Sequence, residues 1–272
     1  MKKFYISIVV IATLFATFSS SQAQSSEIKL SQPMDIGEGC KNIDIAKFEF
    51  VEKDWFEKKL IEDADWQRDD NSWDVYLESN KIMVSTAIYY NRFKFDIDGG
   101  YFLSENHGEF GGKIDFIGND GVNYTVLKCN PRYMFSIDNE VYLIEGLSHF
   151  GAHGNLYKLS YIKDKWESEK IYDFNGYPES YIIDQKNIYI IVDTIEYIYD
   201  GNYAVSSNDY SEIIKIPIFA EDIEIQHLLK IPSLSININS MAKKGNMIYI
   251  GHTGGLVIVN LKNNEVKFYT KN

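Results

Sequence analysis

A strand–turn–strand pattern that recurs along the chain constrains the fold more than any other feature of this sequence. In its last copy, the apolar residues 247–250 lead through a glycine-containing turn to a second apolar run at residues 256–259, and residues 265–269 follow a turn at Asn263 and Asn264. Short β-branched and aromatic runs bounded by Gly or Asn are typical of strands joined by hairpins. The sequence therefore predicts an antiparallel, all-β fold.

Three earlier copies precede the last one, and each copy carries a tyrosine in the same strand. These are Tyr101, Tyr142, Tyr189 and Tyr249, at intervals of 41, 47 and 60 residues. One more short strand is expected before the later copies, at residues 132–137, 179–183 and 235–241. Four strands in roughly 40–60 residues form one blade of a β-propeller, so the repeats predict blades that pack against their neighbours.

The last repeat resembles a known blade pattern. Its residues 248–251 (Ile-Tyr-Ile-Gly) and 254–256 (Gly-Gly-Leu) are similar to blades of the pyrroloquinoline-quinone-type and related bacterial propeller repeats. The resemblance covers about residues 99–272 and concerns architecture only, because the tryptophans that mark those repeats are mostly missing and Trp166 alone falls in an outer strand. No cofactor role follows from this resemblance, so any cofactor of the protein stays unknown. A sandwich of two meandering sheets is the alternative fold.

Residues 45–98 fit the repeat less well. They predict a strand pair formed by residues 73–77 and 81–90. They also predict a further strand at residues 93–97 and a short helix at residues 54–65. At about 50 residues per blade, the chain after its leader has room for about five four-stranded blades. We therefore expect a single β-propeller domain over residues 45–272, preceded by an extended polar lead-in at residues 24–44.

Residues 1–23 predict an export signal rather than part of the fold. Lys2 and Lys3 precede an apolar run over residues 5–18, and Ser21 and Ala23 place small residues at positions −3 and −1 of a cleavage site. This is the layout of a signal peptide. The alternative is a membrane anchor, but the run is shorter than the roughly 20 apolar residues of a spanning helix. We expect a periplasmic or secreted protein with no transmembrane segment after cleavage.

The charge balance excludes one class of partner. The chain has 39 acidic and 27 basic residues and a formal charge of −12, and removal of a leader that holds two lysines and no acid leaves −14. Nucleic-acid binding needs clustered Lys and Arg, so we expect no nucleic-acid partner. The sequence also contains no P-loop, no Gly-X-Ser-X-Gly element and no zinc-type spacing of Cys and His.

Two cysteines, Cys40 and Cys129, are candidates for a disulfide. An exported protein meets an oxidising environment in which such a pair forms, and closing the long loop between them would stabilise the fold by a few kcal/mol. The alternative is two unpaired thiols, with Cys129 at the end of the apolar run 126–129.

Four of the five histidines fall in predicted turns between the second and third strands of their blades. These are His107, His149, His153 and His252, and Glu109 lies in the same turn as His107. Because such turns open on one face of a propeller, we expect these five residues to form a ligand-binding site there. All but His252 are candidates for a divalent metal site. The alternatives are a polar pocket without metal and hydrogen bonds that only join neighbouring turns.

These features support an exported β-propeller that acts as a ligand-binding or protein-interaction module through the loops of one face. Its partner would be a small molecule, a glycan or a protein. An exported hydrolase or lyase that uses the same His and Glu residues is the second hypothesis. A structural repeat protein without a small-molecule site is the third. The sequence names neither the ligand nor the reaction, so the catalytic residues and any metal stay unassigned.

Overall fold

The structure is a computed structural model that describes most of the chain from residue 73 onward. The described residues are 28–30, 32–33, 48–52, 55, 73–86, 92–148, 152–184, 187–194, 197–200, 203–206, 210–217, 225–232 and 238–271. The predicted signal peptide, most of the helix predicted at residues 54–65, Cys40 and His149 lie outside them and stay predictions.

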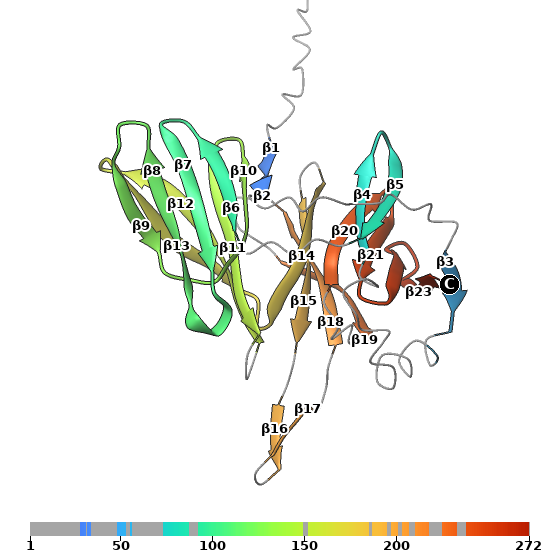
Figure 1. Ribbon diagram of the computed structural model, residues 1–272. Coiled ribbons are helices and arrows are strands. Elements are labelled where there is room, and N and C mark those ends of the chain that lie inside the picture. The colour runs from blue at the N-terminus through green and yellow to red at the C-terminus, as the bar shows by residue number, and fades with distance from the viewer. Residues whose placement is uncertain are drawn as a thin grey trace, which may run out of the picture.

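Four antiparallel sheets, each built mainly from consecutive strands, make up most of the described chain (Figure 1). The first sheet holds β6 (Phe93–Ile97), β7 (Gly100–Asn106), β8 (Gly112–Gly118) and β9 (Asn123–Leu127). The second holds β10 (Pro131–Ile137), β11 (Glu140–Ser148), β12 (Ala152–Ile162) and β13 (Lys165–Asp173). The third holds β14 (Tyr177–Asp184), β15 (Asn187–Thr194), β18 (Tyr210–Pro217) and β19 (Gln226–Pro232). The fourth holds β20 (Ile238–Lys244), β21 (Met247–His252), β22 (Gly255–Asn260) and β23 (Glu265–Lys271).

Shorter strands complete the architecture. Two hairpins stand apart from the four sheets, β4 (Trp73–Glu78) with β5 (Lys81–Thr86), and β16 (Tyr197–Asp200) with β17 (Tyr203–Ser206). Three strands from the N-terminal region add to sheet edges, β1 (Ile28–Leu30) on β10, β2 (Gln32–Pro33) on β6 and β3 (Phe48–Val51) on β23. The N-terminal region therefore adds one edge strand to each of three sheets whose other strands come from later residues.

The prediction of an all-β fold made of blade-like sheets is confirmed. Each tyrosine-bearing repeat forms one four-stranded meander, and the strands expected before the later repeats are β10, β14 and β20. A closed ring and the count of about five blades stay predictions. No helix in the described part of the chain has the length and apolar content needed to cross a membrane.

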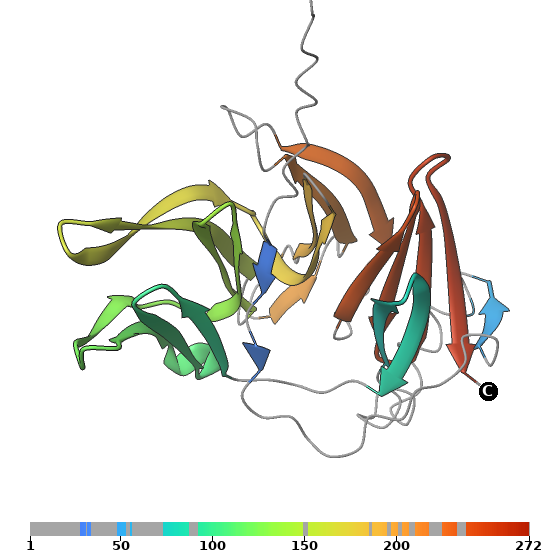
Figure 2. The same ribbon diagram turned by 90° about the horizontal axis from the view of Figure 1, so that it is seen from above.

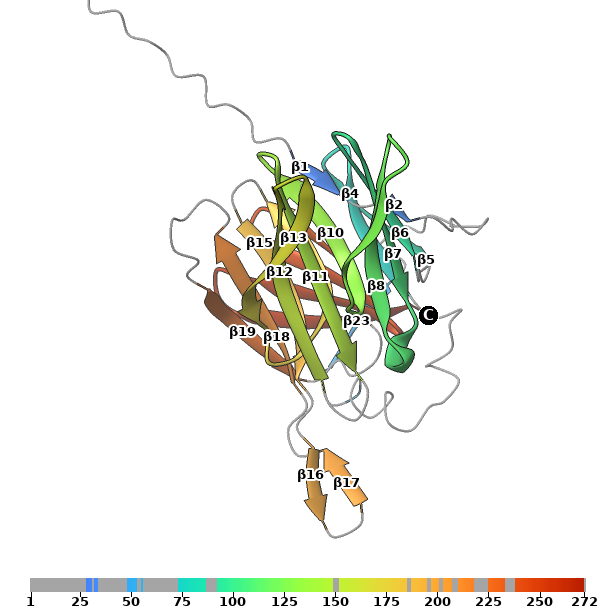
Figure 3. The same cartoon turned by 90° about the vertical axis from the view of Figure 1, so that its left-hand side faces the viewer.

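The four sheets stand around a common centre. Seen from above, the first strands of the sheets lie on the inner side, with β1 among them, whereas β23 and β3 lie at the outside (Figure 2). In Figure 3 the first and second sheets lie side by side and the hairpin β16–β17 projects away from the body. Of these first strands, β14 and β20 contact each other directly, and β14 meets the second sheet through β11 and β12.

Alternating side chains let each middle strand pack on two neighbours at once. In β11, Val141 and Leu143 belong to a buried cluster shared with the first sheet. Tyr142 and Ile144 belong to a second buried cluster, shared with the third sheet. Because successive side chains of a strand point to opposite faces, one short apolar run packs against the sheets on both sides of it.

The same alternation continues around the arrangement. In β15, Ile190 packs in the cluster shared with the second sheet, and Ile191 packs in the cluster shared with the fourth. In the fourth sheet, Leu256 packs against Trp73 and Val84 of the hairpin β4–β5. The hairpin thus occupies the next position after the fourth sheet, as a shorter, two-stranded element.

The first sheet differs from the others because only one of its faces is apolar. Phe102 and Ile114 are buried against the second sheet. The opposite face carries charged side chains, among them Glu105, Lys113 and Asp115. Among the described residues, no hydrophobic cluster joins this face to the hairpin β4–β5. An antiparallel sheet tolerates such a polar face where it meets water.

Replacing Leu143 by Ala tests the packing between the first and second sheets. Leu143 is fully buried in β11, and removing a buried leucine side chain leaves a cavity, so we expect the free energy of unfolding to fall by about 2–5 kcal/mol. Denaturant unfolding measures this change. The control is Leu77→Ala, at a side chain that is 47% exposed, for which we expect a change within about 0.5 kcal/mol. Equal effects of the two substitutions would contradict the packing described above.

Candidate functional site

The first strands of three sheets share an irregularity at the same place. In β10, β14 and β20 the ladder to the second strand skips one residue, and the skipped residues are Arg132, Glu179 and Asn239. Such a β-bulge bends the strand and re-aims the extra side chain, and bulges are frequent next to functional sites. The three bulged residues are all polar and all lie on inner strands.

Each bulged side chain reaches a neighbouring sheet. Arg132 Nη2 lies 3.8 Å from Glu179 Oε2, which joins the second and third sheets. Asn239 Nδ2 donates a hydrogen bond of 3.2 Å to the carbonyl of Trp73 in the hairpin β4–β5. The bulges therefore place polar contacts between inner strands whose other side chains are mostly apolar.

Two tyrosines surround the pair formed by Arg132 and Glu179. The guanidinium of Arg132 lies over the ring of Tyr177, at 4.8 Å from its centroid, and 5.5 Å from that of Tyr133. Arg132 Nη2 and the Tyr133 hydroxyl both donate to the backbone carbonyl of Glu179. We call Arg132, Tyr133, Tyr177 and Glu179 the inner-strand cluster.

Glycines in the second sheet let the third sheet approach closely enough to form this cluster. A Cβ atom on Gly154 would lie 2.3 Å from Cδ of Pro178, and one on Gly146 would lie 2.6 Å from the same atom. Pro178 directly precedes Glu179, so these glycines fix the distance between the two strands of the cluster. Gly146 and Gly154 belong to β11 and β12, so part of the segment predicted as the turn with His149 and His153 is strand, and these glycines are needed for packing.

The cluster lies deep in the protein but is open to solvent. The side chains of Arg132 and Glu179 are 25% and 14% exposed. Burial nevertheless raises the pKa of the Glu179 carboxyl to about 8, with Arg132 lowering it and Asp193 raising it further. A carboxyl group that is surrounded by protein and still reached by solvent is a common feature of binding and catalytic sites.

Several polar atoms near the inner strands lack hydrogen bonds. Nε of Arg132 and Oδ1 of Asn239 are buried and make no hydrogen bond to any described residue. The carboxylate of Glu179 is separated from Arg132 by more than hydrogen-bond distance. Buried polar atoms are nearly always satisfied, so such a group of atoms is a signature of a site that a ligand or water completes.

Two further acids act on the cluster. Asp193 is buried in β15 opposite Tyr177, and its Oδ1 accepts a hydrogen bond of 2.8 Å from Ser211. Asp74, in the hairpin β4–β5, adds to the rise that burial causes in the pKa of Tyr133. The charge of Asp74 therefore acts on the Tyr133 hydroxyl of the cluster.

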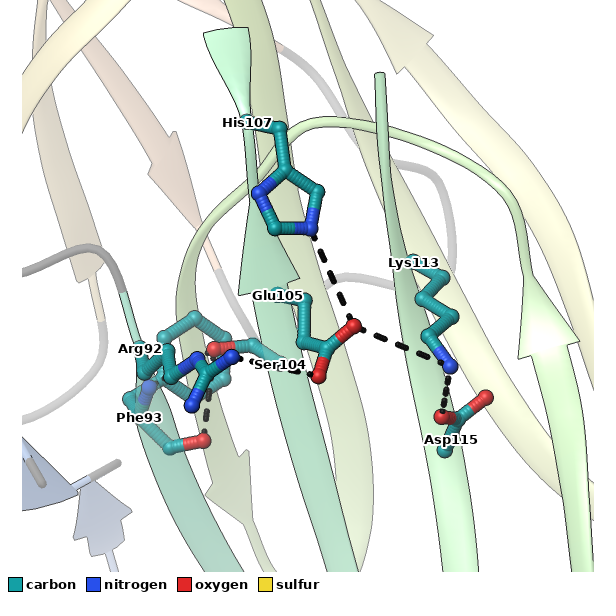
Figure 4. A network of polar contacts seen from close by, with 7 residues as sticks. All are labelled: Arg92, Phe93, Ser104, Glu105, His107, Lys113 and Asp115. Atoms are coloured by element: carbon teal, nitrogen blue, oxygen red, sulfur yellow. Dashed lines mark hydrogen bonds and ion pairs between the residues drawn. The ribbon is translucent and has the colours of Figure 1, made fainter. Parts of the chain in front are cut away.

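The turn that carries His107 and Glu109 contains a different polar network. Nε2 of His107 lies 3.8 Å from the carboxylate of Glu105, and Lys113 and Arg92 lie 3.7 and 3.5 Å from the same group (Figure 4). Lys113 also contacts Asp115 at 2.6 Å. Figure 4 shows these side chains gathered around Glu105 on the polar face of the first sheet. Glu109 is exposed in the short 3-10 turn Gly108–Phe110.

The other predicted histidines occupy dissimilar environments. His153 is an exposed residue within β12, opposite Leu147 of β11. His252 is 1% exposed at the end of β21, where its Nδ1 bonds to the carbonyl of Thr253. No group of three or more His, Cys, Asp or Glu side chains in the described ranges is placed to hold a metal ion. A site that includes His149 falls partly outside those ranges and stays a prediction.

Cys129 lies partly buried between the first and second sheets. It forms no disulfide with a described residue, and the predicted partner Cys40 is outside them, so that pairing stays a prediction. Burial raises the pKa of the Cys129 thiol strongly, with Glu145 adding to the rise. Because the thiolate is the reactive form, Cys129 is a poor nucleophile here.

The sequence analysis did not identify the inner-strand cluster, although a regular spacing in the chain marks its position. Arg132, Glu179 and Asn239 each lie ten residues before the tyrosine of their repeat, Tyr142, Tyr189 and Tyr249. A polar residue at a fixed distance before the tyrosine of each repeat is the signal that could have identified them. No protein-family model matches this chain, and no curated protein matches it in sequence.

The raised pKa of Glu179 predicts how stability depends on pH. The folded protein keeps a proton on Glu179 up to about pH 8, whereas the ordinary carboxyl pKa is 4.5. The free energy of unfolding should therefore fall as pH rises through this window, by up to about 1.4 kcal/mol per pH unit. Glu179→Gln should remove this decline, as measured by urea unfolding at several pH values. Glu105→Gln is the matched control and should keep it; an unchanged decline in Glu179→Gln would refute the assignment.

The lowered pKa of His252 predicts that the free energy of unfolding falls as the pH is lowered, the opposite direction to the effect of Glu179. Burial lowers the pKa of its imidazole from 6.5 to about 4, the bond to Thr253 opposing the shift. The unfolded chain thus binds a proton that the folded protein excludes, and this stabilising contribution is lost as pH falls from about 6.5 to about 4. In His252→Asn the loss of stability over that window should be smaller than in the wild type. His153→Asn, at an exposed position, should behave as the wild type; if instead it matches His252→Asn, buried His252 is not the cause.

Proposed function

We propose that this protein is an exported, propeller-type binding module whose ligand binds at the inner-strand cluster. The bulges at one position in three inner strands carry this proposal, because they bring Arg132 to Glu179 and leave Nε of Arg132 and Oδ1 of Asn239 without hydrogen bonds to any described residue. Blades of a propeller surround a central channel, and their inner strands line it. A bulge in such a strand re-aims a side chain, which can then contact a ligand. The ligand is a small molecule or one end of a larger partner.

The propeller itself is part of this proposal. Four blade-like sheets pack in chain order, and the hairpin β4–β5 packs on the fourth sheet where a partial fifth blade would lie. The resemblance of the last repeat to bacterial propeller blades supports the same arrangement. The predicted signal peptide and the acidic composition support a periplasmic or secreted location.

The location of the ligand differs from the one that the histidines led us to expect. The turn with His107 places its charged groups in contact with one another around Glu105, so their charges are already compensated. The inner-strand cluster instead has a single ion contact, 3.8 Å between Arg132 and Glu179, and Nε of Arg132 makes no hydrogen bond to any described residue. Unused hydrogen-bonding capacity favours binding because a ligand can satisfy it without displacing existing bonds.

An exported hydrolase or lyase is the second candidate, and one observation favours it. Because the pKa of Glu179 is about 8, this carboxyl is protonated at neutral pH, as a general acid must be. The phenol of Tyr133 lies beside it. In this reading Glu179 would donate a proton to a leaving group, and activity would fall as pH rises past about 8.

A thermal-shift screen of the purified protein against metabolites and glycans tests the proposed site. We expect a compound that raises the melting temperature of the wild type to lose its effect in Arg132→Gln and to keep it in the control Glu105→Gln. Enzyme activity toward the same compounds, lost in Glu179→Gln, would favour the second candidate. Compounds that act equally on Arg132→Gln but fail on His107→Ala would place the ligand at the turns and overturn the proposal.

A further inference from the structure

The chemistry of the inner-strand cluster narrows the class of ligand, an inference that rests on the function proposed above. Arg132 presents its guanidinium over Tyr177 and uses Nη2 toward Glu179, while its Nε makes no hydrogen bond within the described chain. A guanidinium with free donors pairs best with a planar anion, since carboxylates match its fork of N–H groups. One part of the ligand should therefore carry a carboxylate.

Acceptors outnumber donors on the other side of the same site. Glu179 faces Arg132 at 3.8 Å, and Asp193 stands behind it in β15 opposite Tyr177. Asn239 occupies the equivalent bulge on β20, which lies beside β14, and its Oδ1 is buried without a hydrogen bond. A second part of the ligand should therefore donate hydrogen bonds and carry positive charge.

Aromatic rings near Glu179 would also bind the positively charged part of the ligand. The rings of Tyr133 and Tyr181 lie with their centroids 4.7 Å apart at an angle of 46°, and the Tyr133 hydroxyl donates to the backbone carbonyl of Glu179. Ring faces attract ammonium groups, and the effect grows where water is excluded. Burial, with Asp193 adding to it, raises the pKa of Glu179, and a cation bound beside this carboxyl would favour its ionised form.

We propose that the inner-strand cluster binds a small zwitterion, a molecule that carries a carboxylate and an ammonium group. The carboxylate pairs with Arg132, and the ammonium group binds between Glu179 and the tyrosine rings, with Asn239 as a further acceptor. Free amino acids and amino-sugar acids share this chemistry. A zwitterion also suits a strongly acidic protein, because its net charge is zero and the overall field does not repel it.

The strand β1 adds to the second sheet at some distance along β10 from the bulge. β1 pairs with residues 135–137 of β10, and its ladder ends at Phe135. The bulge at Arg132 lies beyond that ladder, so the N-terminal strand that adds to this sheet does not pair with the cluster.

Binding should also move a proton. Glu179 is protonated near neutral pH because its pKa is about 8, and an ammonium group beside it favours the ionised form. Calorimetry at about pH 7, in buffers of different ionisation enthalpy, should therefore detect release of up to about one proton per ligand bound. This release should be absent in Glu179→Gln.

The test uses two sets of compounds, the twenty common L-amino acids and muramic acid with related amino-sugar acids, in thermal-shift and calorimetric titrations. We expect at least one zwitterion to bind, and its methyl ester and its hydroxy-acid analogue to bind more weakly. Arg132→Gln should lower the affinity by about 10- to 100-fold through loss of a charge-assisted hydrogen bond, and Glu105→Gln should not. Whether the compound that binds comes from the amino acids or from the amino-sugar acids identifies the class of ligand.

Three outcomes would overturn this inference, and they differ in what else they affect. If neutral sugars or simple anions bind in an Arg132-dependent manner while zwitterions do not, the ligand class is wrong and the binding site stands. If zwitterions bind equally to Arg132→Gln, the cluster is not their site. If no compound of any class depends on Arg132 or Glu179, the function proposed above fails as well.

Discussion

The two-sided packing of the middle strands is the interaction on which the rest of this structure depends. Strands β11 and β15 bury alternate side chains in different clusters, so the second and third sheets are each held by both of their neighbours. A sheet of this kind cannot bury its apolar faces alone, and its stability comes from the sheets beside it. The inner strands are consequently fixed in close proximity, which is the condition for any site that combines residues from different sheets.

The candidate site is a local exception within that packing. At Arg132, Glu179 and Asn239 the regular ladder is interrupted, and polar atoms stay unsatisfied in an otherwise apolar interface. Interruptions of this kind cost stability, because a regular strand would keep its ladder and its apolar contacts. The repeated position of the bulges fits a functional requirement better than a random defect, and the glycines opposite Pro178 show that the surrounding packing accommodates it.

The sequence predicted the sheets, whereas the histidine site stays a prediction, because His149 lies outside the described residues. Alternation of apolar residues and the Gly, Asn and Asp turns depend on local physics, so the strands of all four repeats could be located from the chain alone. The histidines were grouped because they fall in similar turns, yet His252 is buried while His107 and His153 are exposed. Whether turn residues meet depends on the path of each turn in space, which repeat spacing does not report.

By itself, the sequence determined an all-β chain of repeated four-stranded units, because strand and turn preferences act over a few residues. Only the tertiary structure decided which polar residues meet. Arg132 and Glu179 are 47 positions apart, and each looks like an ordinary charged residue of a short strand. They become a pair because a skipped ladder position in each strand turns them toward one another and two small glycines let the sheets approach. Such long-range contacts follow from packing between sheets, which no local pattern in the chain encodes.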